Sequence, residues 1–182
     1  GVKYKGNSSY SANNAKNPLN IKLDYVNNGQ SIDGYNMLKL SNGFHDPTFI
    51  REILTYEIAR EYMPASKASY ANVFINGNWN GLYTCVQSVD NDFTNEHFYE
   101  RKGPLFKVDN TGVQVPNCVS GQHAIWKYYA DTNCLQKAYE MQSSNDWTEL
   151  GNFLDTLNNY FSDVEKVLDV DRTLWMMSFS NL

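Results

Sequence analysis

The stretch from Asn42 to Asp90, NGFHDPTFIREILTYEIAREYMPASKASYANVFINGNWNGLYTCVQSVD, decides the fold of the chain. Asp46 followed by Pro47 is typical of a helix start, because Asp accepts hydrogen bonds from free N–H groups and Pro fits the first helical position. Apolar residues at helical spacing then predict a helix that buries one face and ends near Pro64. These apolar residues are Phe49, Ile50, Ile53, Leu54 and Ile58.

A β-hairpin is predicted directly after this helix. Residues 70–75 are mostly β-branched or aromatic, Asn76-Gly77 is a strong hairpin signal, and residues 79–86 supply the returning strand. The pattern therefore predicts an α+β fold in which an antiparallel sheet and its helix precede further helices. Other strands are predicted at 2–5, 18–23, 35–40 and 105–108, and helices at 135–141, 162–168 and 173–182. A further helix is predicted from a capping-box-like start at 146–149, with Asp146 as the capping residue, through residue 161.

Composition excludes several classes of protein. The net charge of −5 argues against a nonspecific nucleic-acid binder, and no apolar run approaches the roughly 18 residues that a membrane span needs. The three cysteines leave at least one unpaired within the chain, and they lack the C-x-x-C spacing of a structural zinc site. Abundant Asn and 13 Tyr indicate a secreted or cell-surface protein.

Two short motifs each allow a functional and an ordinary interpretation. The loop from Gly6 to Ser9 could bind phosphate through backbone N–H groups, or it could be a polar turn. Lys22 on a strand and Glu52 on the helix could form the lysine–glutamate pair that kinases use at the ATP phosphates. Surface charges in ordinary salt bridges are the alternative, because exposure is the default for Lys and Glu.

Three other groups of residues favour structural roles. Asp169 and Asp171 could begin a metal site, but Asp171 is better explained as a helix cap and Asp169 as the end of the preceding segment. The three histidines have no Ser or Cys partner in a recognisable arrangement, and Cys85 is expected to be a small buried apolar residue.

Four motifs in order resemble those of the CotH-type kinase family, which is named for a spore coat protein. They cover residues 1 to 110 well, and the helical remainder resembles the family loosely. The motifs are Lys5-Gly6-Asn7-Ser8-Ser9, the KNPLNIKL stretch at 16–23, DPTFIRE at 46–52 and VFINGNWNGLY at 73–83.

The resemblance implies an atypical protein kinase that uses ATP and Mg²⁺ or another divalent metal to phosphorylate Ser or Thr of a protein substrate. Residues 1–110 would be its N-terminal lobe, and residues 111–182 would be the start of an incomplete second lobe. The expected location of the protein is the exterior or the cell surface of a bacterium. The implied nucleotide-binding residues are Gly6, Asn7, Ser8 and Ser9 over the phosphates, Lys22 in contact with them, Arg51 or Glu52 beside Lys22, and Gln87 near the adenine.

Two departures from the family pattern affect the expected activity. Gln87 stands where the family usually has Glu, and a neutral amide cannot balance a cation or hold a metal. The family's Trp-Asp-x-Asp element is not in this chain, so the catalytic residues are expected beyond Leu182 and the fragment itself is expected to be inactive. The alternative is a non-catalytic surface or scaffold module, and the apolar segment 174–182 predicts self-association.

Overall fold

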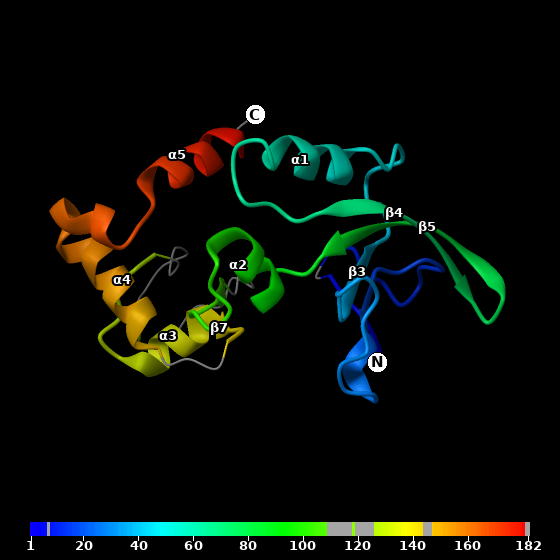
Figure 1. Cartoon of the computed structure of the whole chain (residues 1–182), viewed down its shortest axis with the longest axis horizontal. Helices are drawn as coiled ribbons and strands as arrows, with labels where there is room; N and C mark the ends of the chain where they lie inside the picture. Colours follow the sequence, from blue (N-terminus) through cyan, green and yellow to red (C-terminus); the bar gives the residue numbers. More distant parts are fainter. Residues whose placement is uncertain (7, 109–117, 119–125, 144–146, 181–182) are drawn as a thin grey trace. The chain divides into compact units, whose positions relative to one another are not determined.

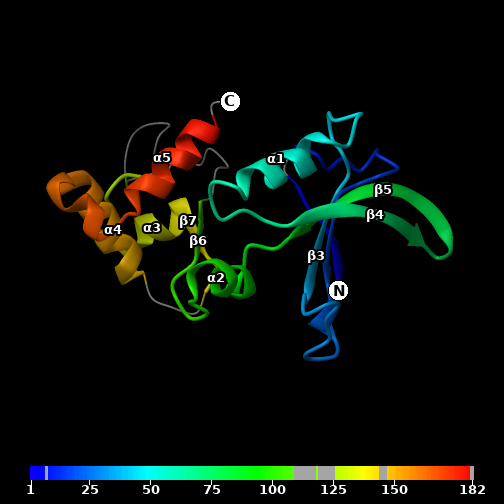
Figure 2. The ribbon, with the colours of Figure 1, turned by 45° about the horizontal axis from the view of Figure 1, so that its top comes forward.

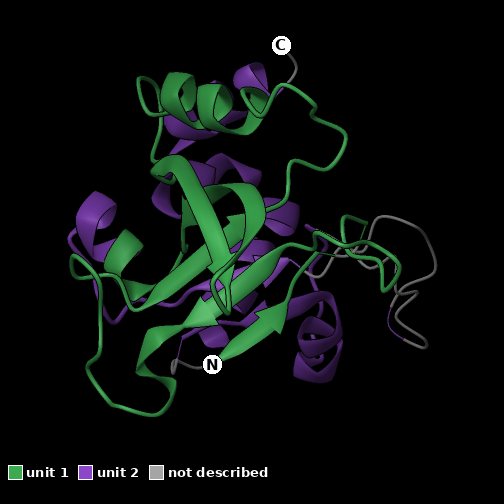
Figure 3. Cartoon of the chain, turned by 90° about the vertical axis from the view of Figure 1, so that its right-hand side faces the viewer, with its two compact units in different colours: residues 1–93 green, residues 94–182 purple. Residues whose placement is uncertain are grey.

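The computed structural model describes residues 1–6, 8–108, 118, 126–143 and 147–180. The chain forms two compact units, residues 1–93 and residues 94–182 (Figure 3). Antiparallel strands and helices occur in the chain, so the predicted α+β class is confirmed. The predicted domain boundary between residues 110 and 111 lies outside the described residues.

The first unit is built on a five-stranded antiparallel sheet with the strand order β1-β2-β3-β5-β4 (Figure 1). The predicted hairpin is confirmed, since β4 pairs with β5 along both strands. Asn76 and Gly77 have φ of 51° and 81°, the left-handed values that a tight hairpin turn requires. The strands are β1 Val2–Tyr4, β2 Leu19–Lys22, β3 Met37–Ser41, β4 Ala68–Ile75 and β5 Asn78–Gln87, with a short 3-10 helix at Leu23–Tyr25.

The strand register gives the sheet an apolar and a polar face. Leu19 pairs with Leu40, and both pack with Tyr83 in a buried cluster on one face. Because side chains alternate along a strand, the neighbouring residues Asn20 and Lys39, which also pair, lie on the opposite face. Two chemically different surfaces therefore follow from one register.

The helix α1, Arg51–Ala59, begins later than the Asp46-Pro47 pair predicts. The Asp46 carboxylate does accept a hydrogen bond from the backbone N–H of Arg51 at 2.9 Å, so its role at the helix start is confirmed. The residues between them form a turn in which Phe49 has a φ of 58°, a left-handed value outside the helical region. Pro47 therefore precedes the helix instead of occupying its first position.

The prediction that α1 buries its apolar face is wrong for three of the predicted residues. Ile50, Leu54 and Ile58 are 51%, 46% and 43% exposed. The Glu52 carboxylate accepts a hydrogen bond from the Ser41 hydroxyl, and this polar contact turns the side of the helix that carries Glu52 toward the sheet. The helix runs beside β4 in two views (Figures 1 and 2).

The second unit combines helices with a small two-stranded sheet. The predicted helix over 135–141 is wrong for its last three residues, because Tyr139–Met141 form β7 and pair with β6, Phe106–Val108. Its core clusters around Leu135 and Leu154. The helices are α2 Asn91–Phe98, which begins in the first unit, α3 Thr132–Ala138, α4 Thr148–Asn159, a 3-10 helix at Phe161–Lys166 and α5 Val170–Phe179.

Covalent and capping contacts fix the ends of the helices in the second unit. Cys118 and Cys134 form a disulfide at the first turn of α3, a pairing that cysteine spacing did not predict. Asp169 caps α5 by accepting from the Arg172 N–H at 3.1 Å, so the prediction that Asp171 is the cap is wrong. The predicted capping residue Asp146 lies outside the described residues.

Two predictions on surfaces have different outcomes. Among the residues that the structure describes, no helix is both long and apolar enough to cross a membrane. Leu174, Trp175, Met176 and Met177 on α5 are all roughly half exposed, and the predicted self-association through this segment stays a prediction.

The core of the second unit gives a direct test of the fold. Replacing the fully buried Leu154 by Ala should lower the free energy of unfolding by about 2–5 kcal/mol, because a cavity replaces packed side-chain atoms. Replacing Leu174, which is 56% exposed, by Ala is the matched control and should change it by less than about 0.5 kcal/mol. Urea unfolding followed by tryptophan fluorescence measures both, and equal losses would contradict this core.

The disulfide gives a second test. Protein purified without reductant and then unfolded should show one reactive thiol, that of Cys85, and three thiols after reduction. Replacing Cys118 and Cys134 by Ser should destabilise the second unit by about 3 kcal/mol, because the unfolded chain loses a closed loop that restricts it. Three thiols before reduction would show that the pair does not form.

Candidate functional site

A chain of two hydrogen bonds joins β1, β3 and α1 at one end of the sheet. The Lys5 ammonium donates to the Ser41 hydroxyl at 3.0 Å, and the Ser41 hydroxyl donates to the Glu52 carboxylate at 3.0 Å. Lys5 directly follows β1, where its N–H extends the ladder by bonding to the carbonyl of Pro18. A cation and an anion are thus connected through a neutral hydroxyl.

The environment of Lys5 lowers the pKa of its ammonium. Burial is the largest cause, because a partly desolvated site disfavours the charged form. Glu52 raises the pKa and Lys39 lowers it further. Lys5 therefore loses its proton at a lower pH than an exposed lysine does.

The structure brings Glu52 together with Lys5 and places Lys22 elsewhere. Lys22 pairs with Met37, the first residue of β3, whereas Ser41 is the last. Four residues of strand separate these positions by about 13 Å. The Lys22 ammonium lies 3.8 Å from the Asp24 carboxylate, and its side chain is 51% exposed. Its predicted contact with phosphates stays a prediction.

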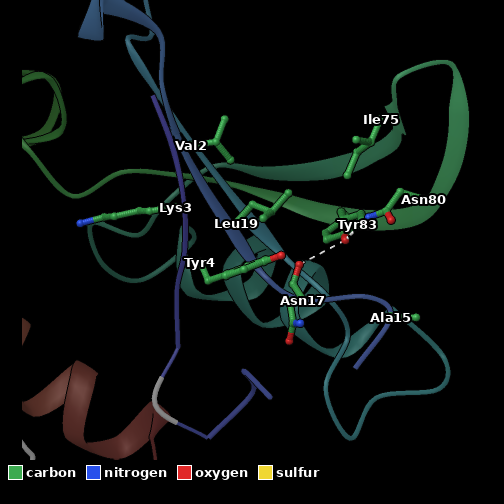
Figure 4. A pocket seen from close by; sticks show the side chains of 9 residues that line it. All are labelled: Val2, Lys3, Tyr4, Ala15, Asn17, Leu19, Ile75, Asn80 and Tyr83. Carbon is green, nitrogen blue, oxygen red and sulfur yellow. Dashed lines mark hydrogen bonds between the residues drawn. The ribbon is translucent and has the colours of Figure 1, made fainter. Parts of the chain in front are cut away.

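Further lysines share the sheet face that carries Lys5. Lys3 pairs with Asn20, and Asn20 pairs with Lys39, so the three side chains form a row across β1, β2 and β3. The Asn20 Oδ1 atom is buried and has no hydrogen-bond partner among the described residues. Figure 4 agrees with this placement, since Lys3 points away from the apolar side chains of the other face. The lysines of this row suit a ligand that carries negative charge.

The predicted phosphate loop lies next to this row. Gly6 has a φ of 87°, a left-handed value that favours glycine, and a Cβ there would also meet the Ser9 hydroxyl. Ser8 is exposed, Ser9 is half-buried, and Asn7 lies outside the described residues. The loop starts immediately after Lys5.

Two asparagines hold this loop in place. The Asn42 amide donates to the carbonyls of Ser9 and Lys16, both at 3.2 Å. The buried Asn17 donates to the carbonyls of Ser11 and Asn14, and its side-chain oxygen accepts from the Ser11 N–H. These bonds satisfy backbone groups of Ser9, Ser11, Asn14 and Lys16, which lie outside the strands.

Lys16 is a structural cation in the segment that connects the Gly6–Ser9 loop to β2. Its ammonium donates to the carbonyl of Asn42 at 3.0 Å and lies 4.4 Å and 4.7 Å from the ring centres of Phe49 and Tyr83. Burial lowers the pKa of this ammonium. Two aromatic faces and a carbonyl surround the Lys16 ammonium. Its contacts therefore stabilise the segment before α1, and we assign it no role in ligand binding.

Arg51 and Gln87, two other predicted nucleotide-binding residues, make contacts with the protein itself. The Arg51 guanidinium donates to the carbonyl of His45 at 3.3 Å and lies 3.9 Å from the Asp46 carboxylate. The side-chain oxygen of Gln87 accepts from the Lys67 N–H at 3.0 Å at the start of β4. Gln87 also lines a pocket of about 350 Å³ with Tyr35.

A second pocket, of about 320 Å³, lies on the apolar face of the sheet (Figure 4). Val2, Leu19 and Ile75 supply apolar walls. Two of its polar side chains are already paired, because the Tyr83 hydroxyl accepts from the Asn80 amide at 2.6 Å and donates to the Asn17 carbonyl at 3.2 Å. The charged groups that suit an anion lie on the other face.

Part of this arrangement coincides with residues that the sequence predicts for a site. Gly6, Ser9 and Glu52 lie in it, Lys22 lies elsewhere, and the sequence does not single out Lys5. Lys5 lies in one of the motifs that carry the family resemblance, so alternation along residues 2–5 could have placed it beside Lys3. Nothing in the sequence distinguished Ser41 from other strand-end serines. Within the described part of the chain, no group of three acidic, His or Cys residues could hold a metal ion.

The turn before α1 generates a pH prediction. A hydrogen bond from the Thr48 hydroxyl is the main cause that lowers the pKa of the Asp46 carboxyl, and the Arg51 N–H also contributes. The stabilisation is therefore present above the ordinary pKa of 3.8 and is lost as the pH falls through the lowered value. Asp46→Asn should remove this pH-dependent part, as measured by urea unfolding at neutral and acidic pH.

The exposed Asp33 supplies the matched control for this experiment. Asp33→Asn is the same chemical change in a loop and should leave the acid dependence of the wild type intact. Identical acid dependence in the wild type and in Asp46→Asn would show that the Asp46 carboxylate does not stabilise the start of α1.

Comparison with known proteins adds a family to this geometry. The family described as CotH kinase protein matches residues 2–182, which is nearly the whole chain. No curated protein matches the chain. The match extends the resemblance from the first 110 residues to the helical second unit. The chain therefore belongs to the CotH kinase family.

Proposed function

We propose that this chain is the nucleotide-binding part of a protein kinase, with the ATP phosphates on the sheet face that carries Lys5. The single observation that carries the proposal is the pair of hydrogen bonds that links Lys5, Ser41 and Glu52 next to the loop that begins at Gly6. Membership of the CotH kinase family supports a kinase-like function. The reaction proposed for the whole protein is phosphorylation of Ser or Thr in a protein substrate.

The chemistry of the face fits a polyphosphate. The Lys5 ammonium has three N–H donors and donates one hydrogen bond to Ser41, which leaves two donors for phosphate oxygens. Lys3 and Lys39 add positive charge across the strands. ATP brings a divalent metal, such as Mg²⁺, which would supply further charge neutralisation at the phosphates.

The disulfide supports the proposed location outside the cell. Disulfides persist mainly in oxidising compartments such as the cell exterior, and they are rare in the reducing cytosol. The pairing of Cys118 with Cys134 is therefore a physical reason to retain the extracellular or cell-surface proposal.

A non-catalytic interaction module is the second candidate function, and two observations favour it. Gln87 is neutral and its side-chain oxygen serves the backbone of β4, so it supplies no charge for a metal or a cation. Ile50, Leu54 and Ile58 leave an apolar strip exposed on α1 at i, i+4 and i+8 spacing. Such a strip is typical of helices that contact another protein.

Calorimetric titration with MgATP separates these candidates. The wild-type chain should bind ATP, and Lys5→Gln should weaken the binding by about tenfold or more, because a charge-assisted hydrogen bond to phosphate is lost. Lys22→Ala is the matched lysine variant. If the sequence prediction is right, Lys22→Ala weakens ATP binding. If the phosphates lie at Lys5, Lys22→Ala binds ATP with wild-type affinity.

Three results would decide the proposal. Loss of binding with Lys5→Gln alone supports the site at Lys5, and loss with Lys22→Ala alone moves the site to the opposite end of β2. No binding by a folded wild type would contradict the proposed function of this chain and favour the interaction module. Circular dichroism of each variant verifies that the sheet remains folded.

A further inference from the structure

The Ser41 hydroxyl stands between two groups that would otherwise attract each other directly. Lys5 and Glu52 both bond to it at 3.0 Å, and among the described residues these two side chains form no direct ion pair. An ammonium only donates hydrogen bonds and a carboxylate only accepts them, so the hydroxyl must accept from Lys5 and donate to Glu52. Its proton therefore has one orientation.

The backbone of Ser41 is held independently of these side chains. Ser41 pairs with Thr84 of β5, and the next residue, Asn42, bonds to the carbonyls of Ser9 and Lys16. The hydroxyl is thus fixed relative to both the sheet and the glycine loop. A side chain at this position can set where the Lys5 ammonium lies.

We propose that Ser41 is a positioning residue of the nucleotide site, which holds the Lys5 ammonium beside the glycine loop and keeps it apart from Glu52. This inference rests on the proposed function. A direct contact with Glu52 would bring the opposite charges to about 2.8 Å and would occupy Lys5 donors that a phosphate needs. The intervening hydroxyl keeps Lys5 oriented by Glu52 while leaving its charge available to an anion.

The charged and titratable groups around Lys5 define what a variant will change. Glu52 of α1 and Lys39 of β3 lie on the same side of the sheet as Lys5, and Cys85 of β5, on the apolar face, also acts on its charge. Ser41→Ala leaves all of these groups in place and removes the hydroxyl that accepts from Lys5 and donates to Glu52. Ser41→Thr keeps the hydroxyl and is the conservative rescue. Ser69→Ala, at an exposed position of β4, is the control for losing a strand serine.

The first measurement needs no nucleotide. The rate at which acetic anhydride modifies Lys5 is followed against pH by mass spectrometry of peptides, since only the neutral amine reacts. In Ser41→Ala the midpoint should move to lower pH, because the partly buried ammonium has lost an acceptor; Ser41→Thr and Ser69→Ala should match the wild type. An unchanged midpoint, or a rise from direct pairing with Glu52, would overturn the inference.

The second measurement uses calorimetry with MgATP and with adenosine. Ser41→Ala should raise the Kd for MgATP by about tenfold and leave that for adenosine unchanged, and Ser41→Thr should restore the MgATP value. If Ser41 had a purely structural role, Ser41→Ala would weaken the binding of MgATP and of adenosine equally. That result would overturn the positioning role. Failure of the wild type to bind MgATP would overturn the proposed function, whereas normal binding by Ser41→Ala would overturn only the role of Ser41.

Discussion

The two hydrogen bonds through the Ser41 hydroxyl connect three segments that are far apart in the sequence. Lys5 follows β1, Ser41 ends β3, and Glu52 lies in the first turn of α1. One hydroxyl accepts from the cation and donates to the anion, so it fixes the orientation of both. The position of the cation and the side of α1 that faces the sheet therefore both depend on this contact.

Asn42 extends the same constraint to the glycine loop. Its amide bonds to the carbonyls of Ser9 and Lys16, while Lys16 returns a hydrogen bond to the Asn42 carbonyl. Segments outside the sheet have no ladder to satisfy their backbone groups, so side-chain amides take that role. The consecutive residues Ser41 and Asn42 thus link the loop, the sheet and the helix at one place.

The two faces of the sheet have different roles for a related reason. Leu19, Leu40 and Tyr83 are buried together on one face, whereas lysines line the other. The polar face is also the one that α1 approaches through Glu52, which leaves Ile50 and Leu54 exposed. The apolar residues of α1 alone predicted that their side of the helix would face the core. The polar contact of Glu52 with Ser41 instead turns the Glu52 side toward the sheet.

Local chemistry in the sequence by itself determined the antiparallel strands, the Asn76-Gly77 hairpin and the glycine of the loop at Gly6, because turn geometry and strand alternation depend on neighbouring residues. The family resemblance also came from sequence motifs. Only the tertiary structure decided that Lys5 is linked to Glu52 through Ser41, that Cys118 pairs with Cys134 and that residues 139–141 form a strand. Each of these depends on contacts between residues distant in the chain, and such contacts leave no periodic pattern in the local sequence.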